Sequence, residues 1–149
     1  MRVLLDANVL LSYLLAPDVP GTIQTIVEAA LGGRFDVLLP EELLNETLAA
    51  VQRKPSLRER ISVAEANALI MELRAVAELL PRVDAPLPRI ARDPKDDYLI
   101  AQALLGRADI LVSGDRDLLA LADLVLPLKI VHPADFARML SSPEAGSPD

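Results

Sequence analysis

Four short apolar runs recur along the chain, and each precedes a segment with the length and apolar spacing of a helix. The runs are "RVLLD", "FDVLLP", "DILVS" and "LKIV". Runs this short and this apolar are typical of strands buried on both faces. Strands that alternate with helices favour a parallel sheet, because the returning chain must cross over the sheet between strands. The pattern therefore predicts an α/β fold with a parallel sheet covered by helices on both faces.

The expected helices are separated by clear start and stop signals. Ser62 and Glu65 form a capping-box pattern, and Gly33 and Gly106 follow expected helix ends. "PRVDAP" is a further candidate strand. The predicted helices cover residues 7–16, 20–32, 41–53, 63–80, 94–106, 115–122 and 133–140. We expect one domain over residues 1–140 and a disordered tail over residues 141–149.

Composition is that of a packed domain. Of 149 residues, 52% are hydrophobic and 25% are charged, which excludes an intrinsically disordered chain. The N-terminal segment superficially resembles a signal peptide, but Asp6 and Asn8 interrupt its apolar core and no small-residue cleavage site follows. No apolar run is long enough to span a membrane. The chain has no cysteine, which excludes disulfides and thiolate metal sites. We expect a cytoplasmic protein.

The net charge of −7 bears on possible partners. A typical nucleic-acid-binding domain carries a basic face, so this charge argues against tight, nonspecific binding to nucleic acid. It does not exclude a metal-dependent enzyme that touches a few phosphates, because bound cations can dominate the local field.

Acidic residues follow two of the predicted strands. Asp6 comes directly after the first strand, and Asp115 follows "ILVS" through Gly114. Sites in open parallel sheets lie beyond the carboxyl ends of the strands, so both acids could face one crevice. Each could instead simply cap the helix that follows it. Ser113 offers a hydroxyl at the same strand end, or is a solvated loop serine.

The stretch "RDPKDDYLIAQALL" contains three aspartates with different expected roles. Asp93 before Pro94 suits an N-cap followed by Pro at the first helical position, and Asp96 then suits the third position of a capping box. Asp97 differs because it falls on the face that should pack on the sheet, together with Ile100, Ala101 and Leu104. A partly buried carboxylate needs hydrogen-bond donors or a cation.

The helix "EELLNETLAAVQRK" offers a fourth acid. On a helical wheel Glu46 borders the apolar stripe, Glu42 lies further round, and Glu41 falls beyond the opposite edge. Glu46 is therefore the best candidate to lean inward, and the alternative is a solvated helix edge. Carboxylates without a nearby histidine or cysteine favour a hard cation such as Mg²⁺. His132, the only histidine, is interpreted as structural or exposed.

Four motifs in this order resemble the PIN-domain family, and more narrowly the PIN-type toxins of prokaryotic toxin–antitoxin pairs. They are "LLDANVLLS", a Glu within "LPEELLNETLAAVQRK", "RDPKDDYLIAQAL" and "ADILVSGDRDLL". Each motif alone is weak, whereas the ordered set is fairly specific. The resemblance covers residues 2–140.

The resemblance implies an α/β/α sandwich and a Mg²⁺- or Mn²⁺-dependent endoribonuclease. Matched by position, the metal-binding and catalytic acids are Asp6, Glu46, Asp97 and Asp115, with Asp117 accompanying the last as a metal ligand. Asn8 and Ser113 match supporting polar positions. The family usually has Thr at the position of Ser113, so the hydroxyl is kept. The resemblance also implies a homodimer and a small antitoxin that blocks the site.

Clustered carboxylates of this kind hold one or two metal ions, which activate water and stabilise charge on the leaving oxygen. Either Glu46 or Asp115 could orient the attacking water. Cations that could meet the RNA backbone, or could be solvated surface charges, are Arg53, Lys54, Arg92 and Arg116. The net charge favours weak, metal-dependent or shape-selected RNA binding.

Other classes of protein fit less well. A phosphoacceptor receiver domain needs an acidic pair after the first strand and a lysine after a late strand, but Asp6 stands alone and Lys129 precedes "IV". A D-x-D phosphatase lacks its second acid, because Asn8 occupies that position. No P-loop, G-x-G-x-x-G or G-x-S-x-G motif is present. The alternative that remains open is a PIN-like scaffold without activity that acts only through a partner.

Overall fold

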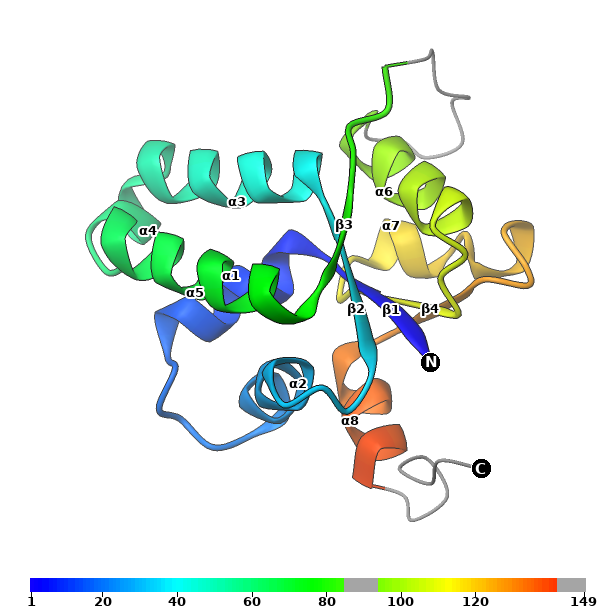
Figure 1. Cartoon of the computed structure of the whole chain (residues 1–149), viewed down its shortest axis with the longest axis horizontal. Helices are drawn as coiled ribbons and strands as arrows, with labels where there is room; N and C mark the ends of the chain where they lie inside the picture. The colour runs from blue at the N-terminus through cyan, green and yellow to red at the C-terminus, as the bar shows by residue number, and fades with distance from the viewer. Residues whose placement is uncertain (85–93, 142–149) are drawn as a thin grey trace.

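The computed structural model describes residues 1–84 and 94–141, which form five strands and the helices around them (Figure 1). The strands are β1 (Arg2–Leu5), β2 (Asp36–Pro40), β3 (Glu78–Leu80), β4 (Ile110–Val112) and β5 (Lys129–Val131). The helices are α1 (Ala7–Leu15), α2 (Thr22–Leu31), α3 (Glu41–Arg53), α4 (Pro55–Arg58), α5 (Val63–Val76), α6 (Pro94–Leu105), α7 (Arg116–Leu119) and α8 (Pro133–Ser141), with a 3-10 turn, η1, at Ala122–Leu124.

All neighbouring strands pair in parallel, in the order β3-β2-β1-β4-β5. From the central strand β1, the sheet extends through β2 to β3 on one side and through β4 to β5 on the other. Figure 1 shows α6 and α7 on one side of the sheet, with α1, α3 and α5 on the other. The predicted three-layer α/β/α sandwich with a central parallel sheet is therefore confirmed.

The centre of the sheet forms the core. The apolar residues of β1, β2 and β4 are almost fully buried because helices cover both faces, which explains why these strands read as continuous apolar runs. α8 packs against α2, and the rings of Phe35 and Phe136 meet edge to face with centroids 5.2 Å apart. In the described part of the chain, every helix is too short or too polar to cross a membrane.

Several predicted boundaries differ from the structure. The helix after Ser62 ends at Val76, and residues 78–80 form strand β3, whereas we predicted helix to residue 80 and a strand at residues 81–86. β3 is an edge strand with a largely exposed burial pattern, so its sequence lacks the apolar signal of the central strands. Of the predicted strand, residues 81–84 are irregular and residues 85–86 lie outside the described residues. The short helix α4 was not predicted.

The ends of two predicted segments also changed. The segment after Asp115 forms only the four residues of α7, followed by η1, in place of one helix over residues 115–122. The last helix extends to Ser141, the first residue of the predicted tail. The rest of the predicted tail, residues 142–149, lies outside the described residues.

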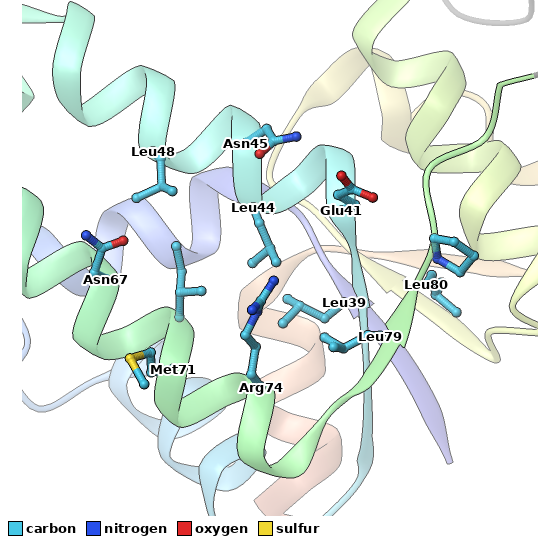
Figure 2. Close-up of a pocket in the computed structure, with 12 residues that line it drawn as sticks. Leu39, Glu41, Leu44, Asn45, Leu48, Asn67, Met71, Arg74, Leu79 and Leu80 are labelled. Atoms are coloured by element: carbon cyan, nitrogen blue, oxygen red, sulfur yellow. The ribbon is translucent and has the colours of Figure 1, made fainter.

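A groove of about 680 Å³ lies between α3, α5 and the edge strand β3. Figure 2 shows Leu44 of α3, Met71 and Arg74 of α5, and Leu79 of β3 lining it, with Glu41 at the start of α3. Glu41 is exposed there, as expected for a position beyond the far edge of the α3 apolar stripe.

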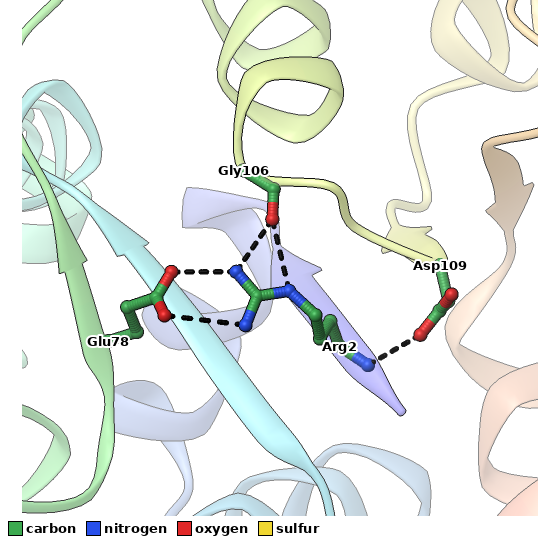
Figure 3. Close-up of polar contacts among 4 residues, drawn as sticks. All are labelled: Arg2, Glu78, Gly106 and Asp109. Atoms are coloured by element: carbon green, nitrogen blue, oxygen red, sulfur yellow. Dashed lines mark hydrogen bonds and ion pairs between the residues drawn. The ribbon is translucent and has the colours of Figure 1, made fainter.

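Arg2 ties three elements together at the amino-terminal edge of the sheet (Figure 3). Its guanidinium donates from Nε and Nη2 to the carbonyl oxygen of Gly106, at 3.0 and 2.7 Å. Nη1 and Nη2 also contact the carboxylate of Glu78, at 3.3 and 2.6 Å. The backbone N–H of Arg2 donates to Oδ2 of Asp109 at 2.8 Å. These bonds hold the end of α6 at this edge, so its first turn lies toward the opposite, carboxyl-terminal edge.

Candidate active site

The ends of β1 and β4 meet where the strand order reverses, and this is where open parallel sheets bind ligands. Asp6 follows β1 and is only 7% exposed. Ser113 follows β4, is fully buried, and donates from Oγ to Oδ2 of Asp6 at 2.8 Å. The same Oγ accepts from the backbone N–H of Asp115 at 3.0 Å. The alternative of a solvated loop serine at Ser113 is therefore wrong, because its hydroxyl links both strand ends.

Asp6 and Asp115 differ in how they relate to the helices that follow them. Asp6 stands at the N-cap position of α1 but makes no side-chain capping hydrogen bond, so simple capping does not explain its carboxylate. Asp115 does cap α7, because its Oδ1 accepts from the backbone N–H of Asp117 at 2.8 Å. The capping alternative thus describes Asp115 and not Asp6.

Burial raises the pKa of the Asp6 carboxyl above its ordinary value. The hydrogen bond from Ser113 opposes this effect, as do the backbone N–H groups of Asn8 and Ala7, which lie near the carboxylate without making a capping hydrogen bond of normal geometry. The negative charge of Asp115 raises the pKa further, because like charges disfavour ionisation of the second acid. The charge of Asp115 therefore acts on Asp6 across the strand ends.

Asp97 lies in the first turn of α6 and is buried, with 4% of its surface exposed. Its predicted inward orientation is confirmed, but two of the predicted neighbours on that face are not. Leu104 is 45% exposed and Ala101 is only partly buried, because the buried stripe of α6 runs through Leu99, Ile100, Gln102 and Ala103. The adjacent Asp96 is partly exposed. Asp93 and Arg92 lie outside the described residues, so the predicted N-cap stays a prediction.

Glu46 is partly buried, in agreement with the inward lean predicted from the α3 wheel, and its carboxylate meets a residue of α6. The hydroxyl of Tyr98 donates to its Oε1 at 2.7 Å. Burial raises the pKa of Tyr98, and the carboxylates of Glu46 and Asp6 raise it further. The Tyr98–Glu46 contact therefore joins α6 to α3.

Glu42, one turn before Glu46, has a structural role that the sequence did not reveal. Both of its carboxylate oxygens accept from Nε2 of Gln102, at 2.9 and 3.2 Å, and Oε2 also accepts from the backbone N–H of Val83 at 3.1 Å. Gln102 is 3% exposed and donates further to the carbonyl of Pro81 at 2.8 Å. A glutamine within an apolar helix stripe was the signal that could have pointed to this contact.

The remaining predicted residues lie at or near the same edge, with varied exposure. Asn8 is exposed in the first turn of α1, and Asp117 is exposed in α7. His132 is exposed and its Nδ1 accepts from the backbone N–H of Ala134 at 3.1 Å, which fits the predicted structural role. Among the predicted RNA-contacting cations, Arg116 follows Asp115 directly.

Two other predicted cations are less well placed. Arg53 ends α3, and Lys54 follows it, so both lie at the end of that helix remote from strand β2 (Figure 1). Both are exposed. A solvated surface charge therefore describes these two residues better than a contact to RNA at the strand ends.

The predicted acids do not form a ready-made ligand set among the residues that the structure describes. Among the described residues, no three acidic or histidine side chains lie in an arrangement that could hold a metal ion. The four-acid site therefore stays a prediction.

A three-layer fold whose central parallel sheet carries buried and partly buried acids at the strand ends defines a narrow class of α/β proteins. A family model for the PIN domain matches residues 2–117, a range that includes all the predicted acids. The chain therefore belongs to the PIN-domain family.

The fold is also similar to a chain in the crystal structure of VapBC2 from Rickettsia felis, bound to a DNA fragment from their promoter. The two share 11% sequence identity with a TM-score of 0.55, over 89% of this chain and 98% of that chain. At this identity the likeness concerns the fold alone. Among curated proteins, none matches the sequence.

Proposed function

We propose that this PIN domain is a divalent-metal-dependent endoribonuclease that hydrolyses phosphodiester bonds in RNA, and that it is the toxin of a toxin–antitoxin pair. The observation that carries the proposal is a pair of buried aspartates, Asp6 directly after β1 and Asp97 in the first turn of α6. Buried carboxylates are costly unless donors or a cation offset their charge.

The donor set suits Mg²⁺ or Mn²⁺, which prefer oxygen ligands. Asp6, Glu46, Asp97 and Asp115 would hold the ion, and Asp117 would join them from the first turn of α7. Burial and the charge of Asp115 raise the pKa of Asp6, which means that its negative charge is unfavourable in the folded chain. A bound cation would offset that charge. When bound, the ion would supply activation of water and compensation of negative charge.

The chain's own residues would prepare the site for RNA. Ser113 orients the Asp6 carboxylate and Tyr98 orients that of Glu46. Asp115 or Glu46 would accept a proton from the attacking water, and Arg116 is the described predicted cation best placed to meet a phosphate. With a net charge of −7, binding would depend on these few contacts and on the metal rather than on a basic groove.

The proposed partners are a small antitoxin protein and a second copy of this chain. The motif resemblance to PIN-type toxins and the fold likeness to a VapBC2 chain support an antitoxin. A small open reading frame immediately upstream of the gene, or overlapping it, would strengthen the proposal.

The experiment that tests the proposal combines cleavage and metal binding. The purified chain is incubated with a panel of RNAs in Mg²⁺, in Mn²⁺ and in EDTA, and Mn²⁺ binding is measured by calorimetry. We expect cleavage only with metal. Asp97→Asn should keep the fold, lose cleavage and lose most Mn²⁺ binding.

The matched control is Asp96→Asn, which removes a neighbouring but partly exposed charge from the same turn. It should retain much more activity than Asp97→Asn. Cleavage by Asp97→Asn at the wild-type rate would overturn the proposed site, and equal losses in both variants would contradict the separate role given to Asp97.

An inactive PIN-like scaffold is the second candidate, because no three described acids lie in a metal-holding arrangement. The same calorimetry separates the two candidates. A scaffold predicts no heat with Mg²⁺ or Mn²⁺ and no cleavage of any RNA, while binding to a partner protein is retained.

A further inference from the structure

His132 lies at the strand end beside the one that carries Ser113. β4 and β5 pair in parallel with Val112 opposite Val131, and the backbone N–H of Ser113 donates to the carbonyl oxygen of Val131 at 3.0 Å. The next residue of each strand, Ser113 or His132, therefore leaves the sheet at the same edge. Because Ser113 also contacts Asp6, His132 extends the row of strand ends at which the proposed site lies.

One nitrogen of the His132 ring is used by the fold. Nδ1 accepts from the backbone N–H of Ala134 at 3.1 Å, and Ala134 lies in the first turn of α8. A nitrogen that accepts a hydrogen bond presents its lone pair, so the ring hydrogen of the neutral imidazole is on Nε2. The bond to Ala134 thus fixes the direction of the ring and makes Nε2 the donor.

The other nitrogen lies next to the loop between Ser113 and Asp115. A Cβ atom added at Gly114 would lie 4.0 Å from Nε2 of His132, and Gly114 itself has no side chain to occupy this space. His132 is exposed, and Nε2 has no hydrogen-bond partner among the residues that the structure describes. A donor that is held in place and exposed to solvent is available to a ligand.

The position of the ring hydrogen decides which kind of ligand Nε2 can bind. A metal ion binds the lone pair of an imidazole nitrogen, which would require the ring hydrogen to move from Nε2 to Nδ1. There the hydrogen would face the N–H of Ala134, so that two donors would oppose each other. Nε2 of His132 therefore suits an oxygen acceptor and not a metal ion.

The acceptor that the proposed function brings to this edge is the phosphate group of RNA. Asp6 and Asp115 repel phosphates, so an RNA strand at the strand ends needs donors beside these acids. Arg116, which follows Asp115, is one such donor. Many protein contacts to nucleic acids go to phosphate and sugar oxygens, from neutral side chains as well as from arginine and lysine. His132 supplies a neutral donor from the neighbouring strand end.

We propose that His132 is a substrate-binding residue that donates from Nε2 to a phosphate oxygen of an RNA strand lying across the ends of β4 and β5. The inference rests on the proposed function, because it assumes that RNA reaches this edge of the sheet. It adds a contact that none of the four sequence motifs contains, from a residue outside the range 2–117 that the family model matches.

The test separates the two nitrogens of His132 by substitution in the full chain. Asparagine can replace Nδ1 as the capping acceptor but does not reach the position of Nε2. Binding of a fluorescently labelled single-stranded RNA is measured by anisotropy at low salt in EDTA, so that metal-dependent cleavage does not interfere. We expect His132→Asn to keep the melting temperature of the wild type. It should bind RNA about 10-fold more weakly, the effect of losing a hydrogen bond to a charged group.

His132→Gln is the matched variant with the opposite defect, because its longer side chain can place an N–H near the position of Nε2 but loses the cap. It should lower the melting temperature by about 3 °C, as expected for the loss of a helix cap in a domain of this size. Its RNA affinity should stay within about threefold of wild type. An asparagine variant that binds RNA as tightly as wild type, or more tightly than the glutamine variant, would overturn the inference.

Nuclear magnetic resonance of the wild-type chain covers the case in which a variant does not fold. The chain has one histidine, so its ring signals are assigned without ambiguity. The spectrum should show the hydrogen on Nε2, and the same RNA should shift the Nε2 signal. Ring signals that do not move at saturating RNA overturn the inference, and cleavage with Mg²⁺ would then leave the proposed function standing. If RNA shifts the ring but neither Mg²⁺ nor Mn²⁺ supports cleavage, the proposed nuclease activity fails and the RNA contact stands.

Discussion

Ser113 Oγ lies 2.8 Å from Oδ2 of Asp6 and joins the ends of strands β1 and β4. The same oxygen accepts from the backbone N–H of Asp115 at 3.0 Å. One fully buried hydroxyl thus orients the first predicted acid and holds the loop that carries the last. The position requires a small group that both donates and accepts, which serine and threonine provide.

Ser113→Ala should lower the free energy of unfolding by about 1–3 kcal/mol, because it leaves buried polar groups without a partner. Ser113→Thr keeps the hydroxyl and should retain most of the stability, with a small loss from the added methyl group. Urea denaturation measures both. If the alanine and threonine variants are equally stable, the hydroxyl does not contribute to the free energy of unfolding, and the prediction fails.

Asp6→Asn should stabilise the metal-free protein at neutral pH. Burial raises the pKa of Asp6 above 3.8 in the folded chain, so the folded state holds this proton more tightly than the unfolded state. Stability from this group is therefore present below about pH 3.8 and is lost as the pH rises through the raised folded pKa. Asparagine cannot ionise but can still accept from Ser113.

Scanning calorimetry in EDTA checks this expectation. At pH 7 the melting temperature of Asp6→Asn should exceed that of wild type, and in a domain of this size each kcal/mol of added stability raises the melting temperature by about 3 °C. The difference should shrink as the pH falls toward 4. Asp18→Asn, at an exposed loop position, is the control and should show little change. A wild-type protein that gains stability relative to Asp6→Asn as the pH rises would contradict the direction of the pKa shift.

Glu42→Gln should destabilise the fold without altering metal binding. The carboxylate accepts from Gln102 and from the N–H of Val83. A glutamine amide has only one acceptor oxygen, so its NH₂ group would face one of these two donors. We expect a loss of about 1–3 kcal/mol in unfolding free energy. Glu41→Gln removes an equal charge from the same helical turn but at an exposed position, so it should cost only about 0.3–1 kcal/mol. Similar losses of unfolding free energy in the two variants would show that the charge at the helix end, and not the contact of Glu42 with Gln102 and Val83, is responsible for the stability.

Ser62→Ala tests a contact that sequence alone predicted. Ser62 Oγ accepts from the backbone N–H of Glu65 at 3.0 Å, and the Glu65 carboxylate accepts from the N–H of Ser62 at 3.2 Å. Loss of this N-cap should cost about 1 kcal/mol in chemical denaturation. Ser62→Asp restores a capping oxygen and should recover most of that loss; a variant that recovers nothing would argue against the cap.

The predictions that succeeded concern residues whose roles are local. The Ser62–Glu65 capping box joins two residues three positions apart, and the central strands needed only their apolar runs to be recognised. Burial of Asp97 followed from the period of α6, although that period misplaced Leu104, which is exposed. The strand β3 was missed because its side chains are largely exposed, so burial imposes no strand pattern on its three residues.

The sequence by itself determined that strands alternate with helices and that acids follow the strands, because these patterns reflect burial and helix capping within a few residues. Only the tertiary structure decided which acids meet which partners. Ser113 and Asp6 are 107 positions apart, and Tyr98 and Glu46 are 52 positions apart. These contacts depend on β1 pairing beside β4 and on α6 lying against α3, and no local pattern specifies either arrangement.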